Sequence, residues 1–233
     1  MRSLLIGTAL AFLAGCTTTP PPDETSNDTS AATAAYRAVG NEPGWSATIA
    51  KGRMTLLLDY GERKIDVAID SRPSFNGHRY SGGNAVLDVT HQLCKDVMSG
   101  MNYPDRATAM VDGKTYQGCG GDPVSLLTGE EWVVEDLGGK GIIDSSRATL
   151  RFADGQVSGR ATCNSYGAST TFTGEGFTVG PIRSTRMACA PALMNQEAFF
   201  LDILAKAARF DFSEDGALLI EDSEGRRITA RRG

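Results

Sequence analysis

Residues 161–204 constrain the fold of this chain more than any other segment. They begin with a strand-like run that ends in a Cys163-Asn164 turn, cross a glycine-rich stretch and reach a second cysteine, Cys189. A run with helical periodicity starts at Pro191, and proline is tolerated in a first helical turn because its missing N–H has no partner there. A strand, two cysteines and an amphipathic helix in this order predict one small unit closed by a disulfide bond.

The predicted helix carries a wide apolar face, which is typical of a helix packed on a sheet. That face consists of Ala192, Leu193, Phe199, Phe200, Ile203 and Leu204.

Four short motifs in this part of the chain carry a family resemblance. Residues 157–159, 163–166, 184–189 and 197–200 read Val-Ser-Gly, Cys-Asn-Ser-Tyr, Ser-Thr-Arg-Met-Ala-Cys and Glu-Ala-Phe-Phe. In this order they resemble the META domain of the heat-inducible HslJ-like envelope proteins of bacteria, over about residues 126–232. The family usually has glycine before the Cys-Asn pair, where this chain has Thr162. The resemblance implies heat induction and tolerance of certain antibiotics, without a molecular mechanism.

The N-terminus has the pattern of a lipoprotein signal peptide. Arg2 precedes an apolar run that is too short to span a bilayer, and residues 13–16 read Leu-Ala-Gly-Cys. This tetrapeptide resembles the lipobox, so we predict that residues 1–15 are removed and that Cys16 carries the acyl chains, palmitate among them. The alternative is an ordinary secretory signal. Thr17 and Thr18 lack the aspartate of inner-membrane retention, which favours an outer-membrane lipoprotein facing the periplasm or the surface.

Residues 16–35 have the composition of a flexible linker. They contain no large apolar residue that would offset the entropy of ordering. The formal net charge of the chain is −5 and no block of basic residues stands out, so we expect no nucleic-acid partner. The basic pairs Arg226-Arg227 and Arg231-Arg232 are expected to face solvent on a terminal edge strand, with a lipid headgroup site as the alternative.

The other four cysteines form an even set, which in an exported protein indicates disulfide bonds. Three connectivities are possible, and we predict Cys94–Cys119 and Cys163–Cys189 because each pair lies within one segment. Zinc binding by these cysteines is the alternative to disulfide bonds. Their spacing contains no Cys-x-x-Cys pair, so no metal site is predicted.

The rest of the chain predicts an α+β fold that is predominantly antiparallel β. Alternating strand-like runs with turn residues between them indicate two small β-rich domains, residues 36–122 and 126–232, the second with the helix packed on its sheet. The predicted strands cover residues 45–49, 54–58, 64–69, 85–90, 107–111, 114–116, 131–137, 148–152, 156–161, 209–212, 217–221 and 227–230.

The first half also resembles a family, that of uncharacterised bacterial envelope lipoproteins. The motifs are Val-Gly-Asn-Glu-Pro-Gly-Trp at residues 39–45, residues 94–104, and Tyr-Gln-Gly-Cys-Gly-Gly at residues 116–121. This resemblance implies the same location and no activity.

Residues typical of catalysis are scarce. His78, in a Gly-rich loop, and His91, just after a strand, lie beside no nucleophile-elbow motif, and we interpret both as surface or hydrogen-bonded histidines. No catalytic residue and no cofactor is predicted.

Arg186 and Asn164 are the possible partner contacts. For Arg186 the rival interpretation is an arginine that hydrogen-bonds loop carbonyls near the disulfide bond. Four methionines near the cysteines, Met98, Met101, Met187 and Met194, are interpreted as core residues rather than as oxidation targets.

We therefore predict a non-enzymatic, lipid-anchored envelope protein that supports envelope integrity or tolerance of stress and antibiotics. The alternative is a binding module that inhibits a lysozyme or a protease through residues 75–80, with a protein partner in the envelope. A hydrolase is the third hypothesis and rests only on the two histidines.

Overall fold

The computed structural model describes residues 35–174 and 176–233. The predicted signal peptide, Cys16 and nearly all of the predicted linker lie outside the described residues. Ala34–Gly233 forms one compact unit. Among the described residues there is no helix whose length and apolar character would let it cross a membrane.

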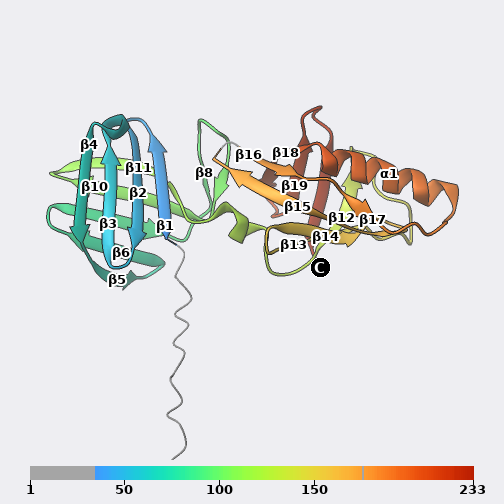
Figure 1. Ribbon diagram of the computed structural model, residues 1–233, viewed down its shortest axis with the longest axis horizontal. Coiled ribbons are helices and arrows are strands. Elements are labelled where there is room, and N and C mark those ends of the chain that lie inside the picture. Colours follow the sequence, from blue (N-terminus) through green and yellow to red (C-terminus); the bar gives the residue numbers. More distant parts are fainter. Residues whose placement is uncertain (1–34, 175) are drawn as a thin grey trace, which may run out of the picture. The chain divides into compact units, whose positions relative to one another are not determined.

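The first half of the described chain folds into one antiparallel sheet (Figure 1). Its strands are β1 (Tyr36–Asn41), β2 (Gly44–Ala50), β3 (Arg53–Leu58), β4 (Arg63–Ala68), β5 (Asp70–Ser74), β6 (Gly77–Gly82), β7 (Ala85–Thr90), β10 (Asp105–Val111) and β11 (Lys114–Gly120). A short 3₁₀ turn, η1 (Asp59–Gly61), joins β3 to β4.

This sheet curls into a nearly closed barrel. Its strand order is β4-β3-β2-β1-β11-β10-β7-β6-β5, and only Ile69 separates β4 from β5 in the sequence. The two ends of the order must therefore approach each other. Alternate residues point inward, and Trp45, Leu56, Leu87 and Tyr116 fill the core.

Strand β5 was not predicted, and its residues are all exposed. It reads Asp-Ser-Arg-Pro-Ser and pairs with β6 through a hairpin in which Ser74 lies opposite Gly77. The prediction of a loop around His78 was wrong. His78 lies in β6, because Phe75 and Asn76 already make the turn.

The second half forms another antiparallel sheet. Its strands are β12 (Trp132–Leu137), β13 (Thr149–Ala153), β14 (Gln156–Arg160), β15 (Ser165–Thr173), β16 (Gly176–Val179), β17 (Arg183–Ser184), β18 (Ala207–Phe212), β19 (Leu218–Asp222) and β20 (Arg227–Arg232). A 3₁₀ turn, η2 (Pro123–Leu126), precedes it, and the helix α1 (Pro191–Ala205) lies between β17 and β18.

This sheet is also nearly closed. The order is β16-β15-β14-β13-β12-β20-β19-β18, β17 pairs with β15, and the end strands β16 and β18 lie against each other. Since β20 lies between β12 and β19, the prediction of a terminal edge strand was wrong. Arg226 is paired with Asp202 at 2.6 Å, and Arg231 with Glu135 at 2.9 Å.

Helix α1 starts at the predicted proline and packs near β16, β19 and β20 (Figure 1). Phe200, Ile203 and Leu204 are fully buried there. Ala192 is exposed, against expectation, because it lines an open hollow together with Ile142 and Ile143 instead of packing on the sheet.

The segment between β7 and β10 carries a small two-stranded sheet, β8 (Cys94–Lys95) and β9 (Asn102–Tyr103). Cys94 is bonded to Cys119 of β11, with 5.5 Å between the Cα atoms. Met101 is 3% exposed and belongs to the core of the second sheet, and the Asn102 side chain donates to the carbonyl of Phe210 at 3.1 Å. This segment is thus bonded to the first sheet and packed in the second.

Candidate functional site

The second disulfide bond joins the turn after β14 to the loop before α1. Cys163 is bonded to Cys189, with 6.2 Å between the Cα atoms. Both predicted cysteine pairs, Cys94–Cys119 and Cys163–Cys189, are present in the structure.

A carboxylate on α1 holds the Cys163-Asn164 turn. Glu197 Oε2 accepts hydrogen bonds from the backbone N–H of Cys163 at 3.0 Å and of Asn164 at 2.7 Å. Its Oε1 accepts a third from Asn164 Nδ2 at 2.8 Å. The helix and the turn are thus fixed to each other by charge-assisted bonds as well as by the disulfide.

Asn164 extends this network to the loop after β17. Its Oδ1 accepts from the Thr185 hydroxyl at 2.8 Å and from the Met187 N–H at 2.7 Å. Asn164 is only 4% exposed, so its side chain fixes the loop and does not present itself to a partner. Arg186, between these two anchors, is exposed, and its side chain forms no hydrogen bond to the described residues, contrary to the loop-carbonyl interpretation.

Three further arginines lie on the outer face of the same sheet. Arg151 on β13 pairs with Ser158 on β14, Ser158 pairs with Gly167 on β15, and Gly167 pairs with Arg183 on β17. Directly paired residues share a face of a sheet, so these four residues form one row across the strands. Arg151 lies at one end of that row and Arg183 at the other. Arg160 follows Ser158 by two residues and therefore lies on that face too. We call Arg151, Arg160 and Arg183 the arginine face.

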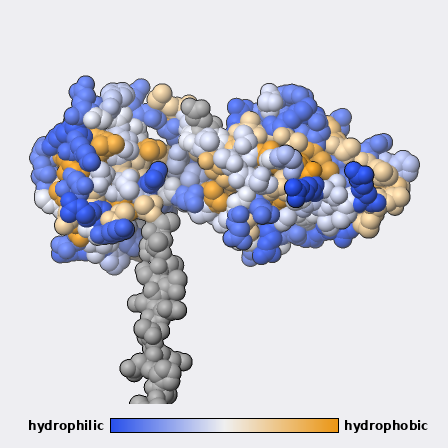
Figure 2. Space-filling model, in the orientation of Figure 1, coloured by the Kyte–Doolittle hydropathy of each residue, from blue (hydrophilic) through white to orange (hydrophobic). Residues whose placement is uncertain are grey.

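The strands that form the arginine face supply no acidic residue. Strands β13, β14, β15 and β17 contain no Asp or Glu. None of the three arginines forms a salt bridge within the described ranges 35–174 and 176–233, although Arg151 acts electrostatically on Glu131. The pKa of Glu131 is lowered, mainly by its hydrogen bond from Arg147. Figure 2 shows strongly hydrophilic residues standing apart in a paler surface over β15 and β17.

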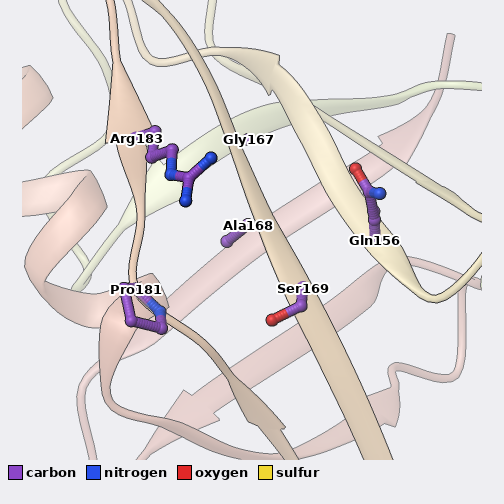
Figure 3. A pocket seen from close by; sticks show the side chains of 6 residues that line it. All are labelled: Gln156, Gly167, Ala168, Ser169, Pro181 and Arg183. Carbon is purple, nitrogen blue, oxygen red and sulfur yellow. The ribbon is translucent and has the colours of Figure 1, made fainter.

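A shallow hollow of about 430 Å³ lies beside Arg183. Figure 3 shows Arg183 extending from β17 toward Gly167, with Gln156 across β15 and the Ser169 side chain nearby. Since Gly167 has no side chain, no side chain fills the hollow at its position. The lining residues are Gln156, Gly167, Ala168, Ser169, Pro181 and Arg183. This surface offers a ligand the guanidinium group of Arg183, the hydroxyl of Ser169 and the side-chain amide of Gln156. The sequence did not predict this surface, because it depends on which residues of neighbouring strands lie opposite each other.

Of the four methionines near the cysteines, the structure buries one and exposes three. Met101 is a core residue as predicted, but Met98, Met187 and Met194 are 73%, 56% and 46% exposed. Their core assignment was wrong, because Met98 lies in a turn, Met187 in the loop between β17 and α1, and Met194 on the solvent side of α1. Phe75, at the turn between β5 and β6, is fully exposed.

Comparison with known proteins bears on the second sheet. Residues 125–232 match the family model of the META domain. An NMR structure of a protein from Burkholderia xenovorans is 21% identical, covers 47% of this chain and 86% of its own, and has a TM-score of 0.40. A second NMR structure is also 21% identical, with 46% and 92% covered and a TM-score of 0.39. No curated protein matches the chain.

The motifs that suggested the family lie at the centre of the geometry described above. Cys163 and Asn164, Thr185 to Cys189, and Glu197 form one bonded network around the second disulfide. The disulfide bonds and this domain fit an extracytoplasmic protein. Residues 125–232 of the chain are a META domain.

Proposed function

We propose that the chain is a non-enzymatic lipoprotein of the bacterial envelope, anchored through acylated Cys16, and that its META domain binds anionic phospholipid headgroups through the arginine face. Such binding would support the envelope under stress, the role that the META resemblance implies. The observation that carries the proposal is that Arg151, Arg160 and Arg183 share one face of β13, β14, β15 and β17, four neighbouring strands that contain no acidic residue. The resemblance of the first half to envelope lipoproteins agrees with it.

The spacing of the arginines favours a surface with several phosphates over one small anion. Neighbouring strands are ~4.8 Å apart, so the Cα atoms of Arg151 and Arg183 are roughly 14 Å apart. A guanidinium group binds phosphate oxygens in pairs of parallel hydrogen bonds. Near an anionic membrane each arginine contributes roughly 1 kcal/mol.

A vesicle sedimentation assay tests this proposal. Protein carrying Cys16→Ser, which removes the expected acyl chains, is mixed with vesicles of phosphatidylglycerol and phosphatidylcholine, or of phosphatidylcholine alone. We expect binding to the anionic vesicles only, and the triple variant R151Q/R160Q/R183Q should weaken it by roughly 100-fold.

The matched control removes the same charge from arginines that have partners. Arg53, Arg63 and Arg79 of the first sheet pair with Asp66, Asp112 and Asp88. The variant R53Q/R63Q/R79Q should bind nearly as well as the parent. Equal loss in both triple variants, or no preference for anionic vesicles, would refute binding by the arginine face. Loss of detergent-phase partitioning in Cys16→Ser tests the anchor separately.

The full exposure of Phe75 favours the inhibitor hypothesis as a second candidate function. An aromatic ring on a two-residue hairpin turn can enter the cleft of an enzyme. On this hypothesis the purified chain inhibits a lysozyme or a protease, and Phe75→Ala abolishes inhibition without changing vesicle binding.

A further inference from the structure

The fold brings together the only two histidines of the chain. His78 on β6 lies opposite Val89 on β7, and His91 follows Val89 by two residues, so both side chains point to the same face. Their ring centroids are 5.9 Å apart and the rings meet edge to face. Both residues are exposed.

A buried carboxylate orients one of the two rings. His91 Nδ1 lies 2.7 Å from Asp105 Oδ1, and Asp105 is 6% exposed. In the neutral imidazole, Nδ1–H donates to this carboxylate and the lone pair of Nε2 is free. Histidines that bind metal ions are held in this way, because the carboxylate fixes the tautomer and raises the basicity of the other nitrogen.

Aromatic side chains fix the surroundings of this pair. The ring of His78 stacks on Tyr80, with centroids 6.1 Å apart, and Tyr80 lies 6.3 Å from Tyr36. The Tyr36 hydroxyl is buried and has no hydrogen-bond partner among the described residues. Burial, and then the nearby Asp105, raise the pKa of Tyr36, so its phenol stays protonated and is not an anionic ligand.

We propose that His78 and His91 form a surface site for a divalent transition-metal ion, Cu²⁺ before Zn²⁺, with Asp105 as the residue that orients His91. Two imidazoles are ligands that suit both ions, and Cu²⁺ binds a given nitrogen site more tightly. Within the described residues no three His, Cys, Asp or Glu side chains converge, so water completes the coordination. The site does not depend on the arginine face.

The competing explanation is a His91–Asp105 pair that serves only the fold. That explanation does not involve His78, because among the described residues the hydrogen bond and ion pair of Asp105 go to His91 and the His78 residue is exposed. A test must therefore include His78 and must read the metal ligands directly.

Titration of the Cys16→Ser protein with CuCl₂, followed by electron paramagnetic resonance and calorimetry, makes this test. We expect one tight site with two imidazole nitrogens bound to the copper. His78→Ala and His91→Ala should each leave one imidazole, and the double variant H78A/H91A should remove the tight site. Asp105→Asn should weaken binding by about 10- to 100-fold while two imidazoles remain.

Thr90→Ala is the matched control, since Thr90 is exposed and adjacent to His91 but points to the other face. It should leave copper binding unchanged, and circular dichroism checks the fold of every variant. The proposal is overturned if the wild type shows no saturable site, if H78A/H91A binds copper as tightly as the parent, or if His78→Ala leaves both imidazole signals intact.

Discussion

Thr162 adopts a backbone conformation that favours glycine. Its φ is 98°, and it immediately precedes Cys163 at the position where the META family usually has glycine. The side chain is 7% exposed, and its hydroxyl accepts a hydrogen bond from Gln196 Nε2 at 3.0 Å. The turn therefore has a backbone conformation that glycine would adopt without strain, and a hydrogen bond offsets part of the cost of the side chain.

This balance predicts different effects for two small substitutions. Thr162→Ala loses the hydrogen bond and keeps the strain, so it should lower the free energy of unfolding by about 1 kcal/mol. Thr162→Gly relieves the strain and should be about 1 kcal/mol more stable than the alanine variant. Urea unfolding followed by Trp132 fluorescence measures both, and equal stability of the two variants would show that the strain is absent in solution.

At the scale of elements, the sequence predicted those strands whose turns have a strong local preference. The turns Lys51-Gly52, Asp112-Gly113 and Asp154-Gly155 all have positive φ at both residues, which is the hairpin geometry that glycine favours. Helix α1 was predicted from its proline and its apolar face. Strand β5, with Pro73 and no buried residue, has no such pattern, and it lies at the end of the strand order, where it pairs with β6.

The candidate sites also differ in whether the sequence could predict them. The two disulfide bonds follow from cysteines close in sequence, and Arg186 is exposed on a short fixed loop. The arginine face and the pair of His78 and His91 depend on which residues of neighbouring strands lie opposite each other. A single sequence does not contain that register, because a shift by one residue would move every side chain to the other face.

For the whole molecule, each sheet has its own core and its own tryptophan. Trp45 is 5% exposed in the first core, and Trp132 is 2% exposed in the second. Each core also has its own disulfide bond nearby, which closes loops of similar length, 25 and 26 residues in sequence separation. Each disulfide bond should therefore stabilise mainly its own core and shift mainly the unfolding transition of that core.

Removal of the second disulfide by C163S/C189S should destabilise the META domain by about 2–5 kcal/mol, because the unfolded chain regains loop entropy and α1 loses its link to the Cys163 turn. Variants with a single tryptophan, Trp45→Phe or Trp132→Phe, report the two cores separately. Only the transition seen by Trp132 should move, whereas C94S/C119S should move that of Trp45. A common shift of both probes in C163S/C189S would mean that the cores unfold together.

Strand β5 has a consequence for how copies of the protein would meet if they share one membrane surface. An outer strand with free backbone groups is a template on which another copy can add a strand, and under the proposed anchoring many copies share one membrane surface. Pro73 lacks the N–H that such pairing requires, and Asp70 and Arg72 place charges along the same strand. These features of β5 disfavour edge-to-edge pairing between neighbouring molecules.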